Sequence, residues 1–109
     1  MCKARDEGAE LVAFAELAFS PFLPQVPATE EPLSQAQPIP GPTTEEFSAL
    51  AEKYGIVVVL NLFGRDAEKT CDSSPVIDTD GKILGVTRMV HIMDGLGFYE
   101  KGYYNPLVD

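Results

Sequence analysis

The 109-residue sequence has few basic residues, few cysteines and no long apolar run. Its eight lysines and arginines stand against 17 acidic residues, which gives a formal net charge of −9. Nucleic acids and anionic membranes bind basic surfaces, so this balance argues against both as partners. The longest apolar runs, "IVVVL" and "LVAFA", are far shorter than the roughly 20 residues that a membrane-spanning helix needs.

Cysteine is represented only by Cys2 and Cys71, which form no CxxC pair. This usage favours a reducing compartment over a disulfide-stapled scaffold. The segment after Met1, "CKARDEGAE", is charged where a signal peptide would need an apolar stretch. We therefore expect a cytoplasmic protein with one small core.

Helix and strand patterns alternate along the chain. The opening "MCKARDEGAE" is typical of the end of a helix that stops near Gly8, and "LVAFAEL" follows as a short buried strand. The clearest helix is "TTEEFSALAEKYG", in which Thr43 and Glu46 predict a capping box and Gly55 predicts the C-terminal stop. The run "IVVVLNLF" then predicts a strand that is buried on both faces.

The second half predicts a hairpin. A polar turn, "GRDAEKTCD", leads to strand "SPVID", a tight turn at Asp80-Gly81 and strand "ILGVTRMV". The last stretch, "HIMDGLGFYEKGYYNPLVD", is rich in glycine and aromatic residues and predicts a loop. The fold class is therefore mixed α/β.

Most of the prolines lie between Ser20 and Pro42. This composition predicts an irregular surface segment, and a fully disordered segment is the alternative. Apolar residues along it favour packing against the core; they are Phe22, Leu23, Val26, Leu33 and Ile39.

Glu16 closes the apolar run "ELVAFAELAF". A buried carboxylate costs several kcal/mol unless it is paired or hydrogen-bonded. Glu16 is therefore either an exposed residue at a strand end or a group kept for chemistry.

Four separated motifs resemble the nitrilase-like carbon–nitrogen hydrolases. They are "GAELVAFAELAF", "PGPTTEEFSALAEKYGIVVVLNLF", "SSPVIDTDGKILGVTRMVHI" and "DGLGFYEKGYYNP". The first resembles the family strand that ends in Phe-Pro-Glu-Leu, with Ala15 where proline is usual, and the third resembles the hairpin that leads to Arg-Lys-x-His. The resemblance implies part of a four-layer α-β-β-α sandwich, with residues 1–109 a partial domain that lacks the first strand and the later part with the nucleophile.

The family's chemistry uses a Glu-Lys-Cys triad and a thioester intermediate. By resemblance Glu16 is the general base that activates the thiol, and Met89 occupies the position of the lysine. Because a thioether carries no charge and donates no hydrogen bond, Met89 puts activity in doubt. No nucleophile is assigned: Cys71 is expected to be an ordinary turn or strand cysteine, and Cys2 is no better placed.

Three residues near the end complete the implied site. Glu100 matches a second acidic residue of the family site, with a solvated loop glutamate as the alternative. His91 is expected to brace the loop rather than transfer protons. Tyr99 and the neighbouring aromatic residues either line a substrate pocket or pack the loop.

The branch that the motifs resemble includes N-carbamoylputrescine amidase and β-ureidopropionase. It implies hydrolysis of an N-carbamoyl amine or ureido acid without metal or organic cofactor, in a homo-oligomer, with the 109-residue chain inactive alone. A non-catalytic paralogue that acts as a partner subunit is the first alternative, which Met89 favours. An unrelated acidic α/β interaction domain is the second.

Overall fold

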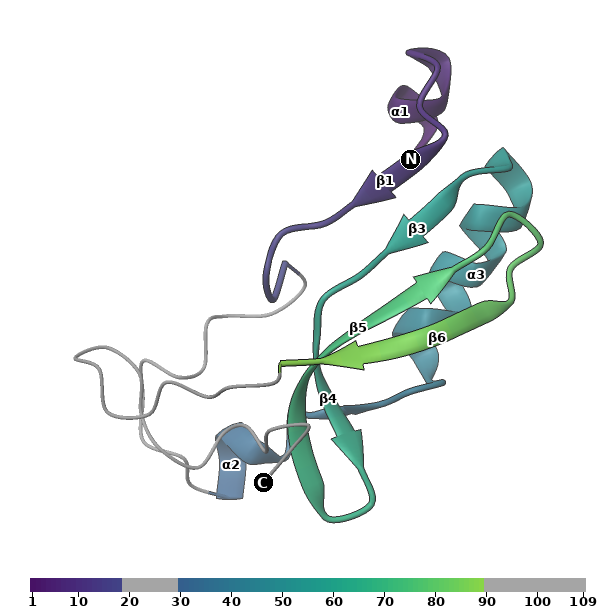
Figure 1. Cartoon of the computed structure of the whole chain (residues 1–109). Coiled ribbons are helices and arrows are strands. Elements are labelled where there is room, and N and C mark those ends of the chain that lie inside the picture. The colour runs from purple at the N-terminus through teal and green to yellow at the C-terminus, as the bar shows by residue number, and fades with distance from the viewer. Residues whose placement is uncertain (19–29, 90–109) are drawn as a thin grey trace.

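A computed structural model describes residues 1–18 and 30–89, which form a mixed sheet with a helix packed against it (Figure 1). The helices are α1 (Cys2–Asp6), α2 (Glu30–Leu33) and α3 (Pro42–Tyr54). The strands are β1 (Leu11–Ala13), β2 (Gln37–Pro38), β3 (Val57–Val59), β4 (Leu62–Asp66), β5 (Lys69–Ile77) and β6 (Ile83–Arg88). The predicted mixed α/β class is confirmed.

The long strand β5 organises the sheet. It runs antiparallel to β3, β4 and β6, and the sheet is extended by β1 parallel to β3 and by β2 parallel to β4. Strands β3 and β4 follow one another along the same edge of β5, opposite β6. Pairing is interrupted between them at Leu60 and Asn61, although the Leu60 N–H still donates to the Pro75 carbonyl over 3.1 Å. The predicted single strand "IVVVLNLF" is thus two strands with a break.

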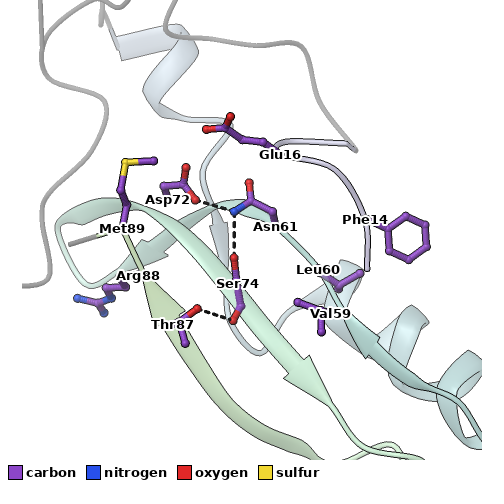
Figure 2. Close-up of a pocket in the computed structure, with 10 residues that line it drawn as sticks. All are labelled: Phe14, Glu16, Val59, Leu60, Asn61, Asp72, Ser74, Thr87, Arg88 and Met89. Carbon is purple, nitrogen blue, oxygen red and sulfur yellow. Dashed lines mark hydrogen bonds between the residues drawn. The ribbon is translucent and has the colours of Figure 1, made fainter. Parts of the chain in front are cut away.

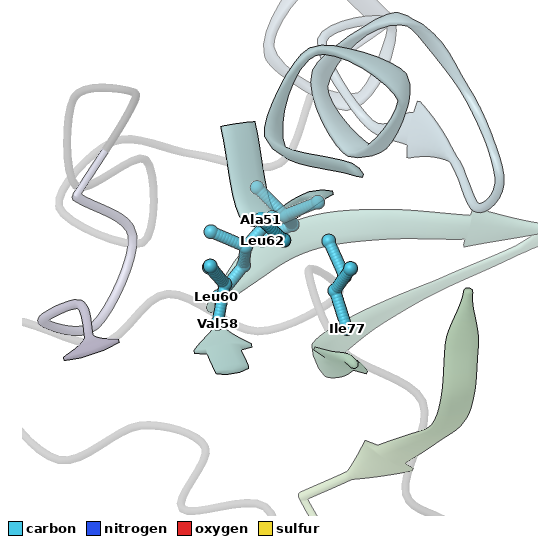
Figure 3. Close-up of a cluster of buried hydrophobic side chains, with 5 residues drawn as sticks. All are labelled: Ala51, Val58, Leu60, Leu62 and Ile77. Atoms are coloured by element: carbon cyan, nitrogen blue, oxygen red, sulfur yellow. The ribbon is translucent and has the colours of Figure 1, made fainter. Parts of the chain in front are cut away.

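The core lies between α3 and the sheet (Figure 3). Its buried cluster comprises Ala51, Val58, Leu60, Leu62 and Ile77. Phe14 and Phe47 pack beside it edge to face, with ring centroids 5.3 Å apart. Ile39 also packs against the cluster, so the proline-rich segment contacts the core at this residue as expected. Each large aliphatic side chain buried here contributes about 1.5–3 kcal/mol.

The start of α3 differs from the prediction. The N-cap is Gly41, whose N–H donates to the Thr44 hydroxyl over 2.8 Å, so the expected capping box of Thr43 and Glu46 is wrong. Pro42 explains the shift, because its fixed φ suits the first helical position, and the N-cap therefore lies at Gly41, two residues before Thr43. The predicted stop at Gly55 is confirmed, with φ 63° and ψ 37°.

The segment "GRDAEKTCD" is also not the polar turn that its composition predicted. It forms the end of β4 and the start of β5, which pair from Leu62 opposite Ser73 to Asp66 opposite Lys69. Burial of Thr70 and Cys71 in this ribbon outweighs the polar composition. The hairpin at Asp80-Gly81 is confirmed, since the Asp78 N–H donates to the Lys82 carbonyl over 2.8 Å and Gly81 has φ 83°.

Two predicted strands are shorter than their apolar runs. Strand β1 ends at Ala13, where the "LVAFAEL" pattern extends to Leu17, and β6 ends at Arg88. Beyond Ala13, the Phe14 N–H still donates to the Val59 carbonyl over 3.0 Å, but the chain then turns. This turn carries Glu16 over the end of the sheet.

Strand β6 leaves apolar surface uncovered by the described residues. Leu84 and Val86 are 64% and 43% exposed, and β6 pairs with β5 along one edge. Exposed apolar strands associate with one another in solution. We therefore expect the isolated 109-residue chain to self-associate, and Val86→Lys to reduce the associated fraction by adding a charge to the strand.

Size-exclusion chromatography with light scattering measures this association. Thr79→Lys is the matched control, because it adds the same charge at an exposed position in the turn of the same hairpin. A wild-type chain that elutes as a compact monomer at the same concentration would contradict the expectation.

Candidate active site

A cavity of about 450 Å³ lies at the end of the sheet, where the turn after β1 meets the break between β3 and β4 (Figure 2). Its walls combine carboxyl, amide and hydroxyl groups with apolar side chains. The lining residues are Phe14, Glu16, Val59, Leu60, Asn61, Asp72, Ser74, Thr87, Arg88 and Met89. The cavity therefore draws on four segments far apart in the sequence.

The position of Glu16 is fixed by its neighbour Leu17. Leu17 is only 4% exposed, and its N–H donates to the Asn61 side-chain oxygen over 2.9 Å. Its φ of 47° lies in the left-handed region, which costs a leucine about 1–3 kcal/mol unless the surroundings impose it. Burial and the hydrogen bond to Asn61 impose this turn, which places the Glu16 carboxyl on the cavity.

Asn61 connects the turn to β5. Its side-chain N–H groups donate to Asp72 over 2.6 Å and to the Ser74 hydroxyl over 3.0 Å (Figure 2). Both acceptors are on β5 and lie on the same face, because alternate residues of a strand point the same way. One amide therefore uses its oxygen for Leu17 and its two N–H groups for β5.

Glu16 and Asp72 face one another at this cavity. Burial raises the pKa of Glu16, and a hydrogen bond with Asp72 and repulsion by its negative charge raise that pKa further. Asp72 is only 5% exposed, and its second oxygen, Oδ2, has no donor among the described residues. The Glu16 carboxyl can donate to Asp72 only while it is protonated. The two groups consequently form an acidic pair in which Glu16 holds its proton more tightly than an ordinary glutamate.

Met89 lines the same cavity from the residue after β6. Its backbone N–H donates to the Asp72 carbonyl over 3.0 Å, which fixes it beside the carboxyl pair. The adjacent Arg88 binds Asp66. The positive charge nearest in sequence to Met89 is therefore already paired.

The structure brings two of the predicted site residues together and leaves the others undescribed. Glu16 and Met89 lie on one cavity. Glu100, His91 and Tyr99 lie outside the described residues. Cys71 is buried within β5, as expected for a strand cysteine, and Cys2 is exposed on α1.

Sequence reasoning missed Asn61, Asp72 and Ser74. Asn61 carried a usable signal, because a polar residue inside the apolar run "IVVVLNLF" must find hydrogen bonds if it is buried. Asp72 was hidden by a segment that resembled a turn, and Ser74 began the predicted strand "SPVID" without any sign of a functional role. Only the three-dimensional structure shows that both side chains line the cavity.

A model of the carbon–nitrogen hydrolase family matches residues 2–108. The chain belongs to the carbon–nitrogen hydrolase family. The expected membership of the nitrilase superfamily is thus confirmed.

Curated relatives and a solved structure agree with this family. The chain is 36% identical over 104 residues to N-carbamoylputrescine amidase of Solanum lycopersicum, covering 94% of the chain and 34% of that protein. It is 43% identical over 65 residues to citrullinase of Francisella tularensis, covering 60% of the chain and 23% of that protein. The chain therefore spans about a third or less of the length of these two relatives.

The crystal structure of a carbon–nitrogen hydrolase from Helicobacter pylori has the same fold, with a TM-score of 0.83 and 32% identity over 95% of this chain and 35% of that one. Crystal structures of N-terminal amidase share the fold at lower identity, one with a TM-score of 0.68 and 21% identity over 78% of this chain and 20% of that one. The helix-on-sheet arrangement of this carbon–nitrogen hydrolase chain is thus a recurrent part of the fold.

Within residues 1–18 and 30–89, no three His, Cys, Asp or Glu side chains are grouped so that they could hold a metal ion. The same residues include no helix long and apolar enough to cross a membrane.

Asn61→Ala should lower the free energy of unfolding by about 1–3 kcal/mol, because it leaves buried hydrogen-bonding groups of Leu17 and Asp72 without a partner. Ser74→Ala is the matched control, since it removes one of the three bonds and should cost less. Urea unfolding of the two variants measures the difference. Equal losses would contradict a central role for the Asn61 amide.

The raised pKa of Glu16 predicts a pH-dependent stability. The folded chain holds this proton more tightly than the unfolded chain, so the stabilisation is fully present below the ordinary value of 4.5 and is lost as pH rises through the folded pKa. Glu16→Gln stays neutral throughout. Its melting temperature relative to wild type should therefore be higher at pH 7 than at pH 4.

Thermal melts at the two pH values measure this effect. Glu10→Gln controls for the loss of one carboxylate, because Glu10 is exposed and lies directly before β1. A melting-temperature difference between Glu16→Gln and wild type that is the same at both pH values would count against the acidic pair.

Proposed function

We propose that the protein containing this chain hydrolyses a non-peptide carbon–nitrogen bond, in an N-carbamoyl amine or ureido acid. The observation that carries the proposal is the shared cavity of Glu16 and Met89, in a chain of the carbon–nitrogen hydrolase family. The relative named N-carbamoylputrescine amidase supports the N-carbamoyl class of substrate. The cysteine nucleophile would come from a part of the protein outside residues 1–109.

Glu16 has the properties of a general base in this scheme. Its carboxyl lines a cavity wide enough for a small substrate, and its raised pKa makes its ionised form a stronger proton acceptor than an ordinary glutamate. It would take the proton of the thiol, which is mostly un-ionised at neutral pH. The thiolate would attack the carbonyl carbon, and water would then hydrolyse the thioester.

The other proposed roles follow the resemblance. Met89 occupies the position of the oxyanion-stabilising lysine, Glu100 is the second acidic residue, and His91 and Tyr99 brace the loop or contact substrate. The proposal includes a partial catalytic domain over residues 1–109, inactive alone, and a homo-oligomeric whole protein. It also includes a cytoplasmic setting, which the two unpaired cysteines support.

A non-catalytic binding subunit is the second candidate. Met89 favours it, because a thioether on the cavity supplies neither charge nor hydrogen-bond donor. The intact mass of the protein from its own cells and its flanking coding sequence test this candidate. A later strand that ends in a cysteine supports the enzyme, and a stop codon directly after Asp109 supports the subunit.

In the whole protein, Met89→Lys should raise the rate of N-carbamoyl amine hydrolysis by about 100-fold, because a donor to a developing oxyanion commonly contributes that much. Glu16→Gln should abolish hydrolysis, since the amide cannot accept the proton of the thiol. Ammonia release measures both rates, with Glu10→Gln as the control. Unchanged rates in both variants would defeat the assigned roles.

A further inference from the structure

The Glu16–Asp72 pair lacks a positive partner among the described residues. Asp72 is almost fully buried, and Figure 2 shows its Oδ2 atom directed toward the Glu16 carboxyl. Apart from the Glu16 carboxyl when it is protonated, that oxygen has no hydrogen-bond donor in the described part of the chain. A buried acceptor left in this state costs about 1–3 kcal/mol, and more if it is charged. A group that brings hydrogen-bond donors or a positive charge to Asp72 Oδ2 and the Glu16 carboxyl therefore stabilises the pair.

The protein groups around the pair are already committed. Asn61 has two side-chain N–H groups, and they donate to the other oxygen of Asp72 and to Ser74. Arg88 lines the cavity but its guanidinium binds Asp66. Among the described residues no cation is left for the pair, and a partner that enters the cavity can reach both carboxyl groups, because the cavity is large enough to hold several non-hydrogen atoms.

The chemistry of the pair favours an ammonium group over a metal ion. Calcium and magnesium take six or more oxygen ligands, whereas the described residues around this point include only two carboxylates and no third metal-binding side chain. An ammonium group is compact and has several N–H donors, so it can bind both carboxylates at once. Met89 offers an apolar wall of the same cavity for an attached alkyl chain.

We propose that Glu16 and Asp72 form a binding site for the primary ammonium group of a small molecule, with its alkyl part against Met89. The group donates one hydrogen bond to Glu16 and one to Asp72 Oδ2, and its positive charge favours the ionised form of Glu16. The site depends on the carboxyl pair and not on the proposed hydrolysis, so binding alone tests it.

The test is an NMR titration of ethylammonium into the full-length protein, with 13C labels on the side-chain carboxyl groups. Saturable shifts of the Glu16 and Asp72 carboxyl signals are expected, together with a lower pKa of Glu16. Tetramethylammonium has the same charge but no N–H donor, and it should bind at least tenfold more weakly.

Two variants change the carboxyl pair and the apolar wall of the site separately. Asp72→Asn should weaken ethylammonium binding at least tenfold by removing one charge. Met89→Lys should weaken it as strongly, because the new side-chain ammonium would occupy the cavity beside the pair. Met89 is only half-buried, so this variant tests the site without disturbing the Asn61 bonds. Glu10→Gln should leave the affinity unchanged.

Three results would overturn the proposal. The first is equal affinity for ethylammonium and tetramethylammonium, which indicates charge attraction alone. The second is an affinity that neither Asp72→Asn nor Met89→Lys reduces. The third is no binding to wild type, which means that the pair is satisfied by a shared proton or by a cation of the protein itself. Hydrolysis is not measured, so failure of the proposed function would leave these results unchanged.

Discussion

The side-chain amide of Asn61 holds together the parts of the chain on which the cavity depends. Its oxygen fixes the turn at Leu17, and its two N–H groups fix Asp72 and Ser74 on β5. These bonds are possible because pairing with β5 is interrupted at Asn61, between β3 and β4. If β3 and β4 formed one continuous strand paired with β5, the side chain of Asn61 would point to one face of the sheet. It could then reach the turn after β1 less readily. A local irregularity thus creates the junction between the sheet and Glu16.

Much of the fold could be predicted from sequence because it follows local rules. The apolar face and the Gly55 stop define α3, and Asp80-Gly81 defines its hairpin through the backbone freedom of glycine. The start of α3 was predicted too late. The prediction took Thr43 as the N-cap, whereas the helix begins at Pro42 with Gly41 as the N-cap. The ribbon of β4 and β5 was missed because its stability comes from pairing and burial of Thr70 and Cys71, which composition does not encode.

The candidate site, like the fold, could be predicted from the sequence only in part. Glu16 and Met89 were identified from motifs, and they lie on one cavity. Asp72 was not identified, because its importance arises only from its position opposite Glu16 in three dimensions. Local sequence patterns indicate which residues are unusual for their surroundings. They do not indicate which of these residues meet, since that depends on the register of β5 against its neighbours.

The carboxyl pair also changes how the family resemblance is interpreted. Membership of the carbon–nitrogen hydrolases accounts for the fold, and the role of Glu16 as a base is a proposal that rests on the motif resemblance. The methionine at position 89 and the buried Asp72 give that glutamate an acidic and partly apolar environment. The chemistry of this cavity therefore depends on how its negative charge is balanced.

The break between β3 and β4 also restricts how the sheet can rearrange. If β4 slid along β5 by two residues, every side chain would keep its face, and an ordinary antiparallel ribbon could tolerate the new register. Here the slide would move Asn61 by two residues relative to Asp72 and Ser74 on β5, so its hydrogen bonds to these two side chains and to Leu17 could not all be kept. The hydrogen bonds of Asn61 at this break thus favour the observed register of β4 and β5 over its neighbours.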